Sequence, residues 1–416
     1  MRTRTVVGML AALVGKRRVL TQAICLAGAC VIASVAAISD ARAQPAQART
    51  YTIQSRILGE QRRIRVALPA NFAIARQRYP VIYLLDGHVR AFFDLTVAAA
   101  SYDLLGDERD FAIPGHIVVA VEHKSRGTDL GSNADAFMRH LTDELAPYIE
   151  RQFRAHPYRI LVGHSLGGRF ALMASCRAPG FFSAIIAVSP GGGDSTAFRA
   201  TTDCLKSDWR AHAGSHRQIF INSGEREQRI DVGAKRLRDF LRDSAPPSVR
   251  WRYAEGPDLA HTETPYAGIP AGIKFIYDRA LWEMPRSRAD SVLEANGDPD
   301  AIIAAWYFEL GARLGYAVPT SAKWLDAAAN AHTARREPAA AERTSRRLVA
   351  EYPEDIRGYG RLADVLIRSG QSAAARRVLD DAVRMIDKLD FFDEMDRALK
   401  RKVLTDALTG LSGGRP

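Results

Sequence analysis

The sequence contains few cysteines and no cluster of cysteine and histidine at metal-ligand spacing. Four of the 416 residues are cysteines, and we expect neither a metal nor a cofactor. The charged residues, 25% of the chain, form no block of one sign, so we expect no nucleic-acid partner. The composition, with 47% hydrophobic residues, is typical of a globular protein with one large domain and a smaller part.

One long hydrophobic run is present, near the N-terminus. Arginine and lysine residues precede an apolar stretch from about Val19 to Ile38, and a small-residue cleavage site follows it. This order predicts a secretory signal peptide over residues 1–43, cleaved after Ala43, and a periplasmic or secreted protein without stable membrane insertion. Because the stretch is long enough to span a bilayer, an uncleaved anchor is the alternative. The stretch continues past Cys30, which argues against a lipoprotein site there.

Removal of this segment changes the charge and the cysteine content. Residues 1–43 hold six Arg or Lys side chains and one acid, so the remaining chain has a net charge of +6. This mildly basic balance is compatible with an anionic substrate or an acidic envelope surface and requires neither. Cys176 and Cys204 remain. They could pair in an oxidising compartment or be two separate buried thiols, and the sequence leaves both open.

Short apolar runs alternate with helical stretches in the first two thirds of the chain. Two β-rich runs at 51–54 and 63–66, with a turn at Gly59, predict an opening hairpin. Further buried or edge strands are predicted at 81–85, 117–121, 160–162, 184–188, 219–221 and 249–253. Helices are predicted between them, notably over 133–153 and 232–243. The alternation predicts an α/β domain over residues 44–285, with a mostly parallel sheet covered on both faces.

Past Pro285 the sequence is rich in Ala, Arg and Leu and has no strand-like run, which predicts a small all-α domain over residues 286–416. Small and apolar residues occur there at the positions of one tetratricopeptide unit: Tyr359, Leu362, Ala363, Leu366, Gly370, Ala375, Leu379 and Ala382. About one and a half units are too few for a free-standing solenoid. We expect a helical part docked on the first domain or on a protein partner, and a generic helical hairpin fits the same pattern.

A nucleophile-elbow pattern is present at Gly163-His164-Ser165-Leu166-Gly167. An apolar run precedes it and a helical pattern of small residues follows, which is the strand, turn and helix context that this motif needs. The glycines permit a tight turn that holds the Ser165 hydroxyl clear of the sheet, and the helix N-terminus favours developing negative charge. We therefore predict that Ser165 is a nucleophile; a glycine-rich turn without chemistry is the alternative. His164 is interpreted as a packing or pocket residue.

With these motifs the chain resembles the esterase branch of the α/β-hydrolases, which includes the esterase D type and the trilactone-siderophore esterases. Matching segments lie in order between residues 50 and 282: 79–87, 126–130, 137–150, 163–168, Ser189-Pro190, Gly224 with Glu227, and His261. The resemblance implies an α/β-hydrolase fold and hydrolysis of a small-molecule carboxylic ester. The sequence departs from the family pattern at Gly191-Gly192-Gly193, since bulky aromatic residues often follow Ser-Pro in that family. That loop faces the pocket in such folds, so the substrate stays open.

A serine nucleophile needs a base, and the base needs an orienting carboxylate; in this fold the chain order is serine, acid, histidine. Glu227 is the preferred acid, with Glu225 and Asp231 as alternates in the same loop. His261, in the loop after the last predicted strand, is the predicted base. The same residues would serve acyl transfer to an alcohol, and no propeller-like β region favours a peptidase.

The oxyanion hole needs two backbone N–H groups. Leu166, directly after the nucleophile, supplies one, and the resemblance assigns the second to His88. Arg90 and Arg126 lie on loops near the predicted pocket and are candidates for binding the anionic groups of a siderophore-type ligand, although such arginines are more often solvated. A non-enzymatic alternative is a hydrolase-like scaffold whose helical tail binds a protein partner.

Overall fold

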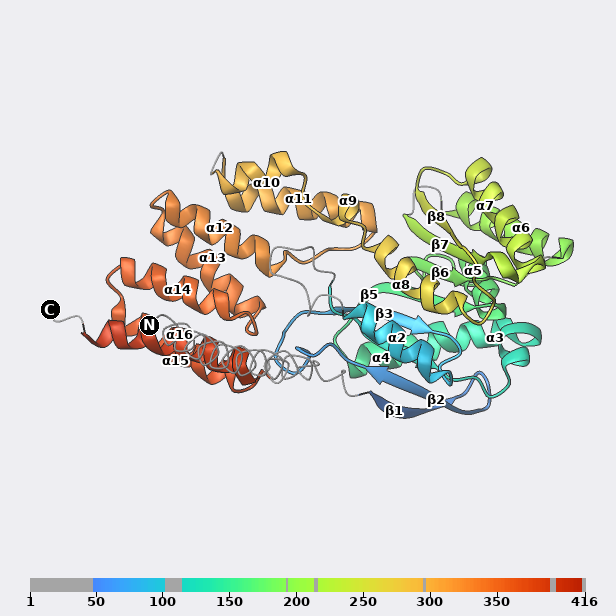
Figure 1. Cartoon of the computed structure of the whole chain (residues 1–416), viewed down its shortest axis with the longest axis horizontal. Helices are drawn as coiled ribbons and strands as arrows, with labels where there is room; N and C mark the ends of the chain where they lie inside the picture. Colours follow the sequence, from blue (N-terminus) through green and yellow to red (C-terminus); the bar gives the residue numbers. More distant parts are fainter. Residues whose placement is uncertain are drawn as a thin grey trace, which may run out of the picture.

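The computed structural model describes residues 48–101, 114–191, 194–212, 216–294, 297–389 and 394–413. The predicted signal peptide, with Cys25 and Cys30, lies outside these ranges, as do Gly192 and Gly193. An eight-stranded sheet carries helices on both faces, and a run of helices follows it toward the C-terminus (Figure 1). This confirms the predicted α/β class with an all-α C-terminal part. Within the described ranges, no helix combines the length and the apolar character that a membrane span requires.

The sheet is mixed, with the strand order β1-β2-β4-β3-β5-β6-β7-β8. The predicted hairpin of β1 (Arg49–Ser55) and β2 (Glu60–Ala67) is antiparallel, and β2 also pairs antiparallel with β4 (Ile117–Val121). The remaining neighbours are parallel and comprise β3 (Tyr79–Leu84), β5 (Ala155–His164), β6 (Ala184–Val188), β7 (Arg217–Gly224) and β8 (Val249–Gly256). Every residue of β3, β4 and β6 is buried, which explains their continuous apolar runs.

Each face of the sheet has its own hydrophobic core. Along β3, Ile82 and Leu84 face one core and Tyr83 faces the other, because successive side chains of a strand alternate. Two helices, α2 (Arg90–Ala100) and α8 (Thr264–Ile276), cover the first core (Figure 1). The second core is covered by α3 (Ala134–Arg139), α4 (Ala146–Gln152), α5 (Leu166–Arg177), α6 (Ser195–Ala211) and α7 (Arg229–Ser244). Cys176 on α5 and Cys204 on α6 form a disulfide, which settles the pairing that the sequence left open.

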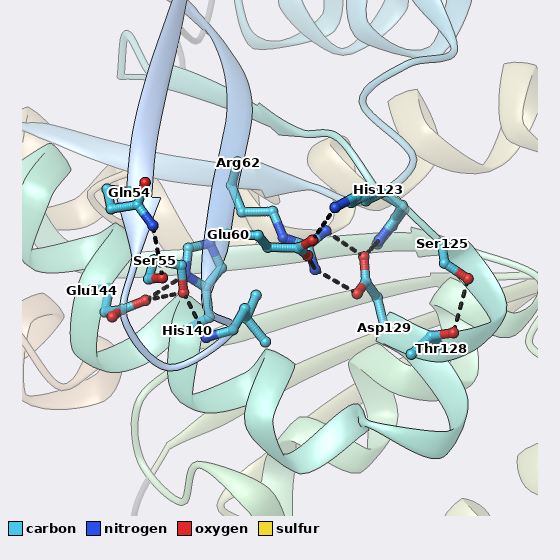
Figure 2. A network of polar contacts seen from close by, with 12 residues as sticks. Gln54, Ser55, Glu60, Arg62, His123, Ser125, Thr128, Asp129, His140 and Glu144 are labelled. Carbon is cyan, nitrogen blue, oxygen red and sulfur yellow. Dashed lines mark hydrogen bonds and ion pairs between the residues drawn. The ribbon is translucent and has the colours of Figure 1, made fainter.

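The helical stretch predicted over 133–153 is present, and its type changes along the chain. Two wide π-helical segments, η2 (Thr128–Ser132) and η3 (His140–Leu145), flank α3, and α4 follows η3. Glu144 in η3 accepts hydrogen bonds from Ser55 Oγ at 2.5 Å and from the Arg56 N–H at 2.8 Å, both next to the β1–β2 turn (Figure 2). A π-turn adds one residue to the helical repeat, so the apolar periodicity alone did not reveal it.

After α9 (Arg279–Trp282) the described chain is all helical. The helices are α10 (Arg286–Leu293), α11 (Pro299–Leu314), α12 (Ala322–Ala334), α13 (Pro338–Glu351), α14 (Ile356–Arg368), α15 (Ser372–Ile386) and α16 (Glu394–Gly413). The apolar residues of the predicted repeat unit lie in one core between α14 and α15. Whether this hairpin is a true tetratricopeptide unit stays a prediction.

The helical part is docked on the α/β part. The ring of Tyr316, just after α11, lies 4.4 Å from the ring of His156 and 4.8 Å from that of Tyr158, both at the start of β5. Nearby, the Asn71 side-chain amide donates to Glu354 at 3.0 Å. These contacts place the helices at the end of the sheet opposite the carboxyl ends of the parallel strands.

Candidate active site

The candidate residues gather where the parallel strands end. Ser165 follows β5, Glu227 follows β7 and His261 follows β8. The carboxyl ends of parallel strands share one edge of a sheet, which is where ligands bind in open α/β folds. Turns at this edge contain five of the six non-glycine residues with positive φ among the described residues: Asp86, Ser165, Ser189, Gln228 and Asp258. Such conformations cost on the order of 1–3 kcal/mol each and cluster at functional sites.

Ser165 is held in a sharp turn between β5 and α5, with φ 57° and ψ −119°. The glycines around it are required by close backbone approach. A Cβ on Gly163 would lie 2.2 Å from the Gly167 carbonyl oxygen, and one on Gly168 would lie 2.9 Å from that of Val188. The turn therefore has the geometry of a nucleophile elbow, with Ser165 directly before the N-terminus of α5.

His261 is joined to a buried carboxylate. Its Nδ1 lies 2.5 Å from Glu227 Oε1, and Glu227 Oε2 accepts from the Gly224 N–H at 2.6 Å and from the Ser189 hydroxyl at 2.9 Å. Burial alone would raise the pKa of Glu227, but these hydrogen bonds outweigh it and hold the pKa below its ordinary value. An ionised Glu227 accepts the Nδ1 proton, which leaves Nε2 of His261 free to take another.

The two alternate acids are occupied elsewhere. Asp231 accepts from the Ser223 hydroxyl at 2.8 Å and pairs with Lys235 at 2.8 Å. Glu225 is exposed and accepts from the Asp258 N–H at 3.2 Å. Of the three acids in this loop, Glu227 alone contacts His261 among the described residues.

His164 connects the elbow to the loop of the base, a contact that the sequence analysis missed. Its Nε2 donates to the carbonyl oxygen of His261 at 3.0 Å, and the two rings lie 4.4 Å apart. Burial, followed by the proximity of His261, lowers the pKa of His164 to about 4, so the ring is neutral at neutral pH and donates through Nε2. The imidazole thus fixes the backbone of the base relative to the nucleophile. Its position next to Ser165 was the only sequence signal for this contact.

The turn after β3 supplies the second predicted oxyanion donor. Its backbone lies against β4, since the Gly87 N–H donates to the Val121 carbonyl at 2.8 Å and a Cβ on Gly87 would lie 2.6 Å from the backbone of Ala120. Among the residues that the structure describes, no acceptor receives a hydrogen bond from the His88 N–H or the Leu166 N–H. With respect to these residues, both backbone amides are available to bind a ligand.

Residues 55–253, which contain the elbow and the acid, match the model of the family described as "Putative esterase". Over these residues the α/β part of this chain is similar to an esterase family, and its fold is that of the α/β-hydrolases. Its solved structural neighbours include an IroE-like serine hydrolase from Shewanella oneidensis, with 22% identity, a TM-score of 0.57, and coverage of 74% of this chain and 100% of that one. An uncharacterised protein from Capnocytophaga ochracea has 15% identity, a TM-score of 0.55, and coverage of 88% and 100%. No curated protein matches this chain in sequence.

At these identities the two structures share the fold with this chain.

The two arginines predicted near the pocket differ in their surroundings. Arg90, at the start of α2, is exposed, and its Nε lies 3.2 Å from Asp94 in the next helical turn. Arg126 points into the wall of the site, where its Nε and Nη2 bond to the two carboxylate oxygens of Asp86 at 2.6 and 3.0 Å. Its Nη2 also donates to the His164 carbonyl at 2.9 Å.

A group of three side chains at metal-ligand distances lies away from the candidate active site. Among the described residues, Asp298, Asp300 and His332 in the helical part are close enough to share an ion. Both ring nitrogens of His332 already have partners, with Nδ1 2.7 Å from Glu337 and Nε2 3.1 Å from Asp300. These contacts account for the cluster as an ion-pair network of the helices.

Proposed function

We propose that this protein is an exported serine esterase that cleaves carboxylic esters through an acyl-enzyme on Ser165. The observation that carries the proposal is the hydrogen-bonded pair of buried Glu227 and His261, whose loop is joined through His164 to the strained turn of Ser165. A buried carboxylate, an imidazole and a hydroxyl in this order are the parts that activate a serine.

In the proposed reaction, His261 Nε2 takes the Ser165 Oγ proton as Oγ attacks the ester carbonyl. The N–H groups of Leu166 and His88 stabilise the negative oxygen, where one such donor contributes roughly 10²–10³ in rate in serine hydrolases. Collapse of the tetrahedral intermediate expels the alcohol, which receives the proton from His261, and leaves the acyl group on Ser165. His261 then deprotonates a water that attacks the acyl-enzyme, and collapse releases the acid and free Ser165. Glu227 stays ionised throughout and stabilises the charged imidazole.

For the substrate we propose an ester of the siderophore-lactone type. The support is the set of ordered motifs that resembles trilactone-siderophore esterases, together with the net positive charge of the chain after residue 43. The exposed guanidinium of Arg90, two residues after the proposed oxyanion donor His88, is available to an anionic group of such a ligand. Acyl transfer to an alcohol would use the same residues, and it is distinguished by its product.

For the location we propose export to the periplasm or the exterior after cleavage behind Ala43. The disulfide between Cys176 and Cys204 supports this, because disulfides persist mainly in oxidising compartments. The mature N-terminus of the protein recovered from the exporting cell tests it. A first residue of Gln44 is expected, and an intact N-terminus on membrane-bound protein would favour an uncleaved anchor instead.

The catalytic proposal is tested with residues 44–416, a chain-length series of p-nitrophenyl esters, a synthetic trilactone and a fluorophosphonate label. We expect Ser165→Ala to abolish labelling and to lower turnover by at least about 10³-fold. Ser291→Ala, at a partly exposed serine of α10, is the matched control and should behave as the unmodified protein. Labelling that survives Ser165→Ala would contradict the assignment, and product formed only with an added alcohol would favour acyl transfer. Absence of both turnover and labelling would favour the scaffold alternative.

A further inference from the structure

A network of buried charged and polar residues lies behind the turn that contains His88. Arg62 on β2 donates from both terminal nitrogens to the carboxylate of Asp129 at 2.7 Å, and His123 Nδ1 lies 3.2 Å from the same carboxylate (Figure 2). On its other side, Nε2 of His123 accepts from the Asp86 N–H at 3.3 Å. The side chains of these four residues are at most 4% exposed. The network therefore fixes the backbone of Asp86, at the start of the oxyanion turn, to the interior.

Arg126 holds the carboxylate of Asp86 from the opposite side and extends the network to the elbow. One guanidinium bonds to both oxygens of Asp86 and to the carbonyl of His164. Asp86 lies two residues before His88, and His164 lies two residues before Leu166. A single planar group thus joins the two backbone segments that present the proposed oxyanion donors. Planarity and fixed donor directions suit arginine to such a bridge, whereas a lysine ammonium lacks the fork.

The contacts of Arg126 argue against a role in holding an anionic substrate. Two of its three nitrogens are bonded to the protein, and the Asp86 carboxylate balances its charge. A substrate anion approaching this guanidinium would meet the negative charge of Asp86 as well. Asp86 also has a φ of 59°, a conformation that persists only when the surroundings enforce it. Arg126 and His123 together supply that enforcement.

We infer that Arg126 is a positioning residue that sets the separation of the two oxyanion donors, His88 N–H and Leu166 N–H, by bridging Asp86 and the His164 carbonyl. The inference rests on the proposed function, because it assigns a part of the same site. It replaces the expectation that Arg126 binds substrate. The rate of ester cleavage depends steeply on this separation, because both N–H donors must lie within hydrogen-bond distance of the negative oxygen in the transition state.

The test compares Arg126→Gln and Arg126→Lys on two esters with the same leaving group, neutral p-nitrophenyl butyrate and anionic mono-p-nitrophenyl succinate. We expect Arg126→Gln to lower kcat by roughly 10–100-fold on both esters while KM changes by less than about threefold. Arg126→Lys should recover only part of the loss, because lysine keeps the charge without the bridge. Asp86→Asn should lower kcat in the same way, and the double variant should be little worse than either single variant.

A matched control separates positioning from general stability. Arg250 also bonds to a carboxylate, Asp278 at 3.0 Å, and to a backbone carbonyl, Phe275 at 2.6 Å, and its side chain is 30% exposed compared with 35% for Arg126. It lies at the start of β8, at the opposite end of the sheet from Ser165. Arg250→Gln should leave kcat unchanged, with the stability of all variants followed by urea unfolding.

An unchanged kcat in folded Arg126→Gln, or a loss confined to the KM of the anionic ester, overturns the inference. A kcat loss that follows the loss of stability equally in Arg126→Gln and Arg250→Gln also overturns it. If Arg126→Gln does not fold, Arg126→Lys and Asp86→Asn carry the same comparison of kcat with KM. Failure of the unmodified protein to turn over either ester, or to label at Ser165, is a failure of the proposed function instead.

Discussion

The carboxyl edge of the sheet and the helical C-terminal part differ in how they hold their residues. The sheet edge that carries Ser165 contains turns with positive φ, and the turn at Asp86 is backed by buried charge pairs such as Arg62–Asp129. In the described helical part, Arg336 is the one non-glycine residue with positive φ, and ion pairs such as Arg368–Asp364 are exposed and one turn apart. Strain and buried charge cost stability, whereas exposed ion pairs contribute little. The difference indicates that the sheet edge holds its side chains in a fixed arrangement at a cost in stability, while the helices are stabilised mainly by apolar packing.

The largest expected effect lies at the sheet edge. Glu227→Gln removes the negative charge that orients His261 and stabilises its protonated form, so kcat should fall on the order of 10³–10⁴-fold with the fold intact. Asp231→Asn is the control, because Asp231, in the first turn of α7, is also buried but bonds to Ser223 and Lys235. Steady-state kinetics on p-nitrophenyl esters measure both variants. A larger loss of kcat in Asp231→Asn than in Glu227→Gln would show that Glu227 is not the acid that orients His261.

The next effect should be on stability alone. Leu366 is fully buried in the core between α14 and α15, so Leu366→Ala should lower the free energy of unfolding of this part by roughly 2–5 kcal/mol. Its neighbour Ile367 is 40% exposed, and Ile367→Ala should cost much less. Urea unfolding measures the difference. We expect kcat/KM of folded Leu366→Ala to stay within about twofold of the unmodified protein, since the contrast above separates packing from catalysis. A kcat loss as large as that of Glu227→Gln would remove the contrast.

The smallest effect concerns pH at the boundary between the two parts. Burial, with the nearby charges of Arg78 and Arg159, lowers the pKa of His156 from its ordinary 6.5 to about 4. Below pH 6.5 this histidine binds a proton in the unfolded chain but stays neutral in the folded protein. The free energy of unfolding therefore falls as the pH drops toward 4, and the loss levels off below pH 4. The full contribution of this shift to the free energy of unfolding is roughly 3 kcal/mol.

Replacing this histidine tests the origin of the pH dependence. In urea unfolding at pH 7, 5.5 and 4.5, His156→Gln should show a smaller decline in stability than the unmodified protein. His216→Gln, at an exposed histidine, should keep the full decline. An unchanged decline in His156→Gln would mean that other groups, such as buried His116, account for it, since burial lowers its pKa to about 4 as well.

Much of the fold was predictable because it is local in the sequence. The buried parallel strands appear as continuous apolar runs, and the glycines of the elbow mark a turn in which a Cβ does not fit. The helical stretch predicted over 133–153 is present, but its apolar periodicity did not reveal the π-helical segment His140–Leu145, in which Glu144 contacts Ser55, almost ninety residues earlier in the chain.

By itself the sequence determined the α/β architecture, the elbow at Ser165 and a short choice of acids and histidines. Only the tertiary structure decided that Glu227 contacts His261, that Cys176 pairs with Cys204, and that Arg126 faces Asp86. The physical reason is the distance along the sequence over which each interaction acts. Strand and turn preferences act between neighbours along the chain, whereas hydrogen bonds and charge pairs depend on distances that arise only when the strand ends meet at one edge of the sheet.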